Sequence, residues 1–152
     1  MQMWELVARE RIRDTLARYN WSGDSARIDD LLQSFCPDGE LEVRGTATAS
    51  GHAAIAEFLG GVAAPSPSIA AGPDRKRIVR HTLTNIRFTE LTPHRAQVSS
   101  YFTVFTEIGL DHYGRYRDVF IPVAEQWLIA HRFVSTDWRA PDSTMAPPSA
   151  LS

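Results

Sequence analysis

One aspartate and one histidine of this chain have the side chains that proton transfer at carbon requires. His81 lies in a strand-like run, and an imidazole titrates near neutral pH, so it can act as a base. Asp24 could accept a hydrogen bond from one ring nitrogen, which would orient the ring and raise the basicity of the other nitrogen. Elimination of water or halide needs such a base. Together, the two side chains could carry out acid–base chemistry.

Two further side chains could complete an elimination. Tyr19 could donate a hydrogen bond to a carbonyl or to a leaving hydroxyl group. Arg132 is always charged and could stabilise an enolate, a leaving anion or a substrate carboxylate. With Asp24 and His81, these residues are the candidates for a catalytic set.

Each of these residues also has an interpretation that is only structural. Asp24 stands where a helix N-cap is needed, and a strand histidine is often a hydrogen-bonded core or surface residue. Tyr19 could be the last apolar position of a helix. Arg132 could pair with an acidic residue of a neighbouring strand, Asp118 or Glu107. Both interpretations stay open from the sequence.

Apolar and aromatic residues predict a pocket that suits a lipophilic ring system. The expected lining consists of Trp21, Phe35, Phe58, Leu83, Phe102, Val104, Tyr116 and Asp118. Tyr116 and Asp118 alternate with two arginines and therefore share one face of a strand. His112 and His131 are expected at the surface. Because no metal-ligand spacing, phosphate loop or dinucleotide motif is present, we expect no metal and no cofactor.

The elements that must position these residues follow from hydrophobic periodicity. Helices are predicted from Trp4 to Tyr19, over residues 28–35 and from Ser50 to a Gly60-Gly61 stop, with a break at residues 20–23. Strands are predicted over residues 40–44, 78–88, 96–107 and 117–134, the last split near Ala124. Helices followed by antiparallel strands indicate an α+β domain whose curved sheet wraps over three helices.

Composition limits the function classes. The chain has 152 residues with 16 basic and 18 acidic side chains, so binding to nucleic acid or to an anionic membrane is not expected. The single cysteine and the charged N-terminus favour a cytoplasmic location.

We expect one domain over residues 1–139 and a flexible tail rich in Pro, Ser and Ala over residues 140–152. The segment from Val62 to Asp74 is expected to be a loop, long enough to be a lid.

Several local strings, in this order along the chain, resemble the SnoaL-like family of the nuclear transport factor 2-like superfamily. They are Tyr-Asn-Trp-Ser-Gly-Asp at residues 19–24, Phe-Cys-Pro-Asp-Gly at 35–39, Gly-His-Ala-Ala-Ile at 51–55, Gly-Arg-Tyr-Arg-Asp at 114–118 and Trp-Leu-Ile-Ala-His-Arg at 127–132, together with the central His81. The resemblance implies a cone-shaped α+β fold with a deep pocket.

Enzymes of this superfamily make the resemblance more specific. Scytalone dehydratases, bile-acid 7α-dehydratases and hexachlorocyclohexane dehydrochlorinases eliminate a group from a cyclic lipophilic substrate, and Asp24 and His81 match residues that they share. Tyr19 is placed like a tyrosine of the bile-acid enzymes, and Arg132 like an arginine of the dehydrochlorinases. The second histidine of scytalone dehydratases has no clear match, and a carboxylate of the bile-acid enzymes falls at Phe105.

The resemblance implies a cofactor-independent lyase or isomerase acting on a small lipophilic cyclic molecule. The alternative is a non-catalytic protein that binds a small molecule, or an assembly subunit similar to the small subunit of ring-hydroxylating dioxygenases. The outer face of the sheet would carry Tyr101, Thr103 and Phe105, and such an apolar face predicts a homo-oligomer.

Overall fold

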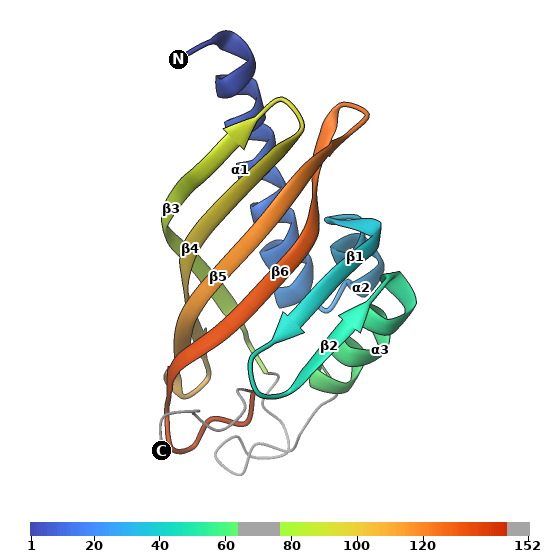
Figure 1. The fold of residues 1–152 in the computed structure, drawn as a ribbon. Coiled ribbons are helices and arrows are strands. Elements are labelled where there is room, and N and C mark those ends of the chain that lie inside the picture. Colours follow the sequence, from blue (N-terminus) through green and yellow to red (C-terminus); the bar gives the residue numbers. More distant parts are fainter. Residues whose placement is uncertain (64–76, 146–152) are drawn as a thin grey trace.

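A computed structural model describes residues 1–63 and 77–145 of the chain. The three helices are α1 (Met3–Asp24), α2 (Ile28–Leu32) and α3 (His52–Ala63). The strands are β1 (Phe35–Val43), β2 (Ala47–Ser50), β3 (Arg80–Thr92), β4 (Arg95–Thr106), β5 (Gly109–Val123) and β6 (Gln126–Arg139). The long strands β3 to β6 lie across α1, and β1, β2 and α3 lie beside them (Figure 1). The predicted α+β class, a curved sheet over three helices, is confirmed.

The strands form one open six-stranded sheet in the order β2-β1-β6-β5-β4-β3. Successive long strands pair antiparallel as hairpins, and the predicted turn near Ala124 separates β5 from β6. One pairing differs from the prediction, because β1 runs parallel to β6. These two strands are joined through α3 and the whole β3–β5 meander, and so long a connection permits a parallel pair.

Helix α1 continues through residues 20–23, where the sequence predicts a break. Asn20 and Ser22 are buried, and Gly23 leaves room for Leu31 of α2, so packing overrides the low helix propensity of this string. The helix ends at Asp24 in a Schellman motif, in which the amides of Ala26 and Arg27 donate to the carbonyls of Gly23 and Ser22. The following helix α2 has Arg27 at its N-cap position. The interpretation of Asp24 as an N-cap is therefore wrong.

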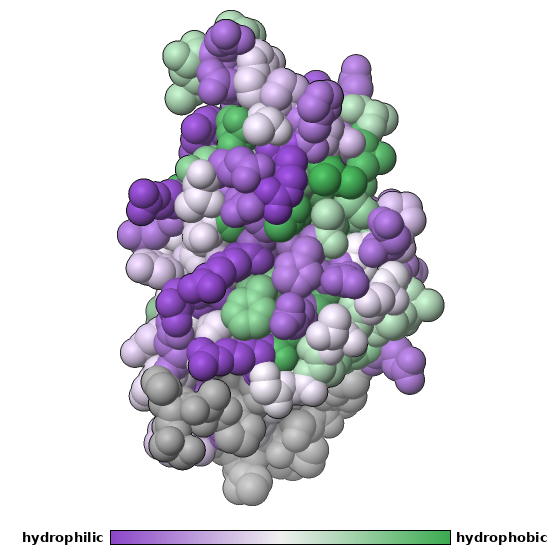
Figure 2. Space-filling view, in the orientation of Figure 1, coloured by the Kyte–Doolittle hydropathy of each residue, from purple (hydrophilic) through white to green (hydrophobic). Residues whose placement is uncertain are grey.

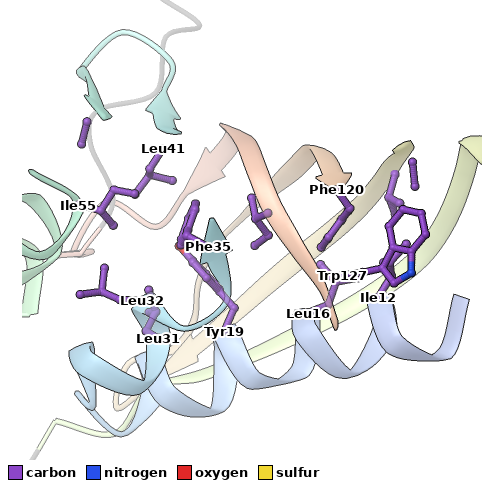
Figure 3. Packing of buried hydrophobic residues seen from close by; sticks show 14 of the residues in the cluster. Ile12, Leu16, Tyr19, Leu31, Leu32, Phe35, Leu41, Ile55, Phe120 and Trp127 are labelled. Atoms are coloured by element: carbon purple, nitrogen blue, oxygen red, sulfur yellow. The ribbon is translucent and has the colours of Figure 1, made fainter. Parts of the chain in front are cut away.

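The main core lies between α1 and the concave face of the sheet. Ile12, Leu16 and Tyr19 point from α1 toward strand residues such as Phe120 (Figure 3). The Thr15 hydroxyl donates to the backbone carbonyl of Trp127 at 2.7 Å, which fixes the helix to β6. The predicted apolar period of the first helix is confirmed, and it is buried against the sheet.

The opposite face of the sheet is hydrophilic over most of its area (Figure 2). Tyr101 and Phe105 of β4 are 51% and 46% exposed on the chain. The homo-oligomer stays a prediction. None of the helices in residues 1–63 and 77–145 combines the length and the apolar character that crossing a membrane requires.

The folded chain continues past the expected boundary at residue 139. The amide of Ala140 donates to the carbonyl of Asp111 at 2.7 Å, and both Ala140 and Ser143 are buried. The rest of the expected tail, residues 146–152, lies outside the described residues. The segment 62–74 is expected to be a loop and a lid. Its residues 62 and 63 are helical, and residues 64–74 lie outside the described residues.

A buried ion pair joins β5, β6 and α1. Arg132 is fully buried, and its Nε and Nη2 each donate to a carboxylate oxygen of Asp118 at 2.8 Å. Its guanidinium carbon lies 4.2 Å from the ring centre of Tyr19 and 3.9 Å from that of Tyr116. Burial alone would lower the pKa of Arg132, but the Asp118 charge outweighs it and raises that pKa. The cation is thus enclosed by one carboxylate and two aromatic faces.

Removing the cation should destabilise the fold strongly. We expect Arg132→Met to lower the free energy of unfolding by about 3–5 kcal/mol, because Asp118 would stay buried without a partner. Adding Asp118→Leu should restore much of this loss. Urea unfolding of both variants measures the effect. The matched control is Arg95→Met, which removes a half-exposed pair with Glu90 and should cost at most about 1 kcal/mol. Equal losses for Arg132→Met and Arg95→Met would contradict the role of the ion pair.

Candidate active site

Asp24 and His81 form a hydrogen-bonded pair. The ring Nδ1 of His81 donates to Oδ1 of Asp24 at 2.5 Å, and the backbone amide of His81 donates to Oδ2 at 3.0 Å. Because the carboxylate accepts both bonds, Nδ1 carries a ring proton, and Nε2 is the nitrogen left to accept a proton from a substrate. The side chain of Asp24 is 11% exposed and that of His81 is 18% exposed. The two residues of the predicted dyad are therefore hydrogen-bonded to each other, and their catalytic role stays a prediction.

Asp24 can reach His81 because α1 extends to Asp24, beyond the predicted helix end at Tyr19. The extra turn carries Asp24 to the helix end beside β3, where the Schellman motif turns the chain into α2. His81 is the second residue of β3, and its backbone amide is bound by the carboxylate of Asp24. One aspartate thus positions both the backbone and the ring of the histidine.

Two cavities share the Asp24–His81 pair in their walls. One, of about 290 Å³, is lined by residues from all three helices and from β1 and β3–β6, and we call it the interior cavity. The other, of about 360 Å³, lies along α1 and β3 and is called the α1–β3 cavity. Asn20 lines both, and its buried Oδ1 has no partner among the described residues.

The structure distributes the predicted site residues over three places. Tyr19, Asp24, Phe58, His81, Phe102 and Tyr116 line the interior cavity. Trp21 and Leu83 line the α1–β3 cavity, and Trp21 is 73% exposed. Phe35, Val104, Asp118 and Arg132 line neither and are fully or almost fully buried in the core. Phe35, Val104 and Asp118 are predicted to line the pocket, and Arg132 is predicted to contact the substrate, but none of the four lines either of these two cavities. The pattern that marks an inward face does not separate a cavity wall from solid core.

A second histidine lines the interior cavity, contrary to the expected surface position. His112 is 8% exposed, and its Nδ1 donates to Oδ1 of Asp111 at 2.6 Å. Asp111 is the extra residue of a β-bulge, because Val104 of β4 pairs with His112 and Phe105 pairs with Leu110. The bulge turns two successive side chains inward, which regular alternation would not allow.

The inward position of His112 could be predicted from the sequence. Tyr116 and Asp118 share one face of a strand, and the same alternation extended toward the N-terminus places Gly114 and His112 on that face. All four are buried in the structure. The bulge that buries Asp111 has no comparable signal, since it depends on the pairing with β4.

Burial changes the protonation of the cavity wall. It lowers the pKa of His112, which favours the neutral ring despite the adjacent carboxylate. Burial would also raise the pKa of Asp111, but hydrogen bonds from Ser143, His112 and Thr106 outweigh it and lower that pKa. Burial raises the pKa of Tyr19, which therefore stays a hydroxyl donor at neutral pH.

A family model described as the SnoaL-like domain matches residues 4–133, so the chain belongs to the SnoaL-like family. The predicted resemblance is thereby confirmed. Nothing among curated proteins matches the chain.

Solved structures share the fold at low identity. A scytalone dehydratase candidate from Novosphingobium aromaticivorans is 19% identical, with a TM-score of 0.77 over 97% of this chain and 96% of that chain. An aromatic ring hydroxylase candidate from the same organism is 22% identical, with a TM-score of 0.68 over 85% and 88%. A Catenulispora acidiphila protein, solved in complex with S-DNPA, is 24% identical, with a TM-score of 0.72 over 85% and 92%.

Lowering the pH should reduce the free energy of unfolding through His112, which is buried in its neutral form. Because its pKa is lower in the folded chain than the ordinary value of 6.5, the unfolded chain gains a proton first as the pH falls. The stability that neutral His112 supplies is thus present above about pH 6.5 and is lost below it. Urea unfolding between pH 8 and pH 5 should show a larger loss for the wild type than for His112→Gln. Parallel losses in both proteins would refute a depressed pKa.

Proposed function

We propose that the protein is a cofactor-independent lyase or isomerase that moves a proton on a small, lipophilic, cyclic carbonyl compound. The observation that carries this proposal is the Asp24–His81 hydrogen bond in the wall of the interior cavity. A base that is oriented by a carboxylate and faces an apolar space is suited to removing a proton from carbon.

The reaction proposed is loss of water from a cyclic β-hydroxy ketone. Nε2 of His81 takes the proton from the carbon between the carbonyl and the hydroxyl-bearing carbon, and the Asp24 carboxylate stabilises the imidazolium that forms. The enolate then expels the hydroxyl group, which takes the same proton from His81 and leaves as water. The ring returns to its neutral state, so the cycle needs no other reactant. Without a leaving group, return of the proton to a different carbon gives isomerisation.

Tyr19 and Tyr116 are the candidates for holding the carbonyl oxygen. Both line the interior cavity, and burial raises the pKa of each phenol, so both stay protonated donors as negative charge develops. Arg132 touches neither cavity but lies between the two rings. We therefore assign it a positioning role, in place of direct contact with an enolate or a leaving anion.

The cavity favours a small ring system. Its volume of about 290 Å³ lies near the lower end of the range for ligand pockets, and Phe58, Phe102 and Leu31 contribute apolar wall. The structural similarity to a ring hydroxylase candidate keeps the alternative of a binding or assembly subunit open to test. A carboxylate that orients the ring of His81 favours catalysis, because binding an apolar ring does not require it.

The first experiment is turnover of 3-hydroxy-1-tetralone, whose dehydration gives the fluorescent product 1-naphthol. The wild type should release 1-naphthol, and His81→Ala should lower kcat/KM by about 100- to 10,000-fold, because the base is gone. Asp24→Asn should lower it as well, since the amide group can stabilise the wrong tautomer. The matched control is His94→Ala in the exposed turn between β3 and β4, which should leave kcat/KM unchanged.

Two results would count against the proposal. Turnover by His81→Ala at the wild-type rate would remove the histidine from the chemistry. Tight binding of cyclic ketones without turnover, over a panel of β-hydroxy and β-halo ketones, would favour the alternative of a non-catalytic binding protein.

A further inference from the structure

We infer that Asp111 and His112 form a second polar anchor in the interior cavity, which accepts a hydrogen bond from a hydroxyl group of the substrate. This inference rests on the proposed function, because it adds a second recognition point to the same cavity. It narrows the substrate class to ring compounds that carry a hydroxyl group at a distance from the reacting carbon.

The carboxylate of Asp111 is held by three donors. His112 Nδ1 and Ser143 Oγ each donate to Oδ1 at 2.6 Å, and Thr106 Oγ1 donates to Oδ2 at 2.9 Å. A carboxylate with this many donors stays ionised and accepts from the ring, so Nδ1 of His112 carries the proton. The other ring nitrogen, Nε2, then offers a lone pair. Nε2 receives no hydrogen bond from the described residues.

His112 and His81 lie on the same side of the sheet, with strand β4 between their strands. His81 pairs in register with Val104, and Val104 pairs with His112, so the two histidines stand in one row across β3, β4 and β5. Side chains in one such row point to the same side of the sheet, and neighbouring strands are about 4.8 Å apart. The two backbones are therefore roughly 10 Å apart. Both rings line the interior cavity, and this span suits the two ends of one small ring system.

The His112 ring is held in place from two directions. Phe102 packs edge-on against it with ring centres 5.9 Å apart, and the Asp111 bond fixes its rotation. Ser143 reaches Asp111 from the segment after β6, where the Ala140 amide also binds the backbone of Asp111. We assign Ser143 as a positioning residue that acts through Asp111.

The chemistry of Nε2 selects the ligand group. An unprotonated imidazole nitrogen accepts a hydrogen bond and cannot donate one, so it favours an alcohol, a phenol or an enol over an ether, a halide or a carbonyl. Binding a ring that lacks the hydroxyl group would leave this buried acceptor without a partner.

The test compares 2-naphthol with 2-methoxynaphthalene, which has a similar shape and cannot donate. Isothermal titration should show that the wild type binds 2-naphthol roughly two- to tenfold more tightly, the range of one neutral hydrogen bond. His81→Ala should keep this preference, and His112→Ala should lose it. His94→Ala is the matched control and should keep it. Nitrogen-15 NMR of the wild type should show Nε2 of His112 unprotonated at pH 7 and shifted by 2-naphthol.

Ser143→Ala tests the positioning role. The variant should reduce the preference for 2-naphthol and broaden the His112 ring signals, because Asp111 loses one of its donors. Ser50→Ala on the exposed strand β2 is the control and should change neither.

Three results would overturn the anchor: equal binding of the two probes, no binding of either, or a preference that survives in His112→Ala. Because the readout is binding, it separates the two proposals. A retained preference in a protein that eliminates nothing would contradict the proposed reaction and leave the anchor standing.

Discussion

The candidate site depends on one carboxylate that connects the end of a helix to the start of a strand. Asp24 accepts from the backbone amide of His81 with one oxygen and from its ring with the other. The first bond fixes where β3 begins relative to α1, and the second fixes the tautomer of the histidine that we propose as the base. The backbone position of His81 and the orientation of its ring thus depend on one side chain, and Asp24 reaches this place because α1 continues through a string of poor helix formers.

Near this connection, the fold buries charged side chains in an apolar interior by pairing each of them with groups that satisfy its charge. Arg132 is neutralised by Asp118 and enclosed by Tyr19 and Tyr116, so a full positive charge is buried without facing either cavity. The same tyrosine rings form part of the interior cavity wall. The ion pair therefore acts on the site indirectly, since it holds two hydroxyl-bearing rings in one arrangement. Asp111 is held in a comparable way, by a bulge and by the segment after β6.

Periodicity predicted the class of fold and the long strands, and the resemblance to enzymes of the superfamily predicted the Asp24–His81 pair. Local signals failed where tertiary packing decides the outcome. Residues 20–23 contain two polar residues and a glycine, and the burial of Asn20 and Ser22 and the close approach of Leu31 to Gly23 favour the helix there. Phe35 and Val104 have the pattern of cavity residues but fill solid core. The inward position of His112 could be predicted by alternation along β5, whereas the burial of Asp111 follows from a register shift with β4, which a single strand does not encode.

The central claim is that His81 removes a proton from the carbon next to a carbonyl group. Proton NMR of 1-tetralone in D₂O tests it most directly, because exchange of the protons next to the carbonyl requires this step and no leaving group. The account predicts that the wild type accelerates deuterium incorporation and that His81→Ala does not, although both bind the ketone. Exchange at the buffer rate with saturated wild-type protein, or equal acceleration by His81→Ala, would contradict it.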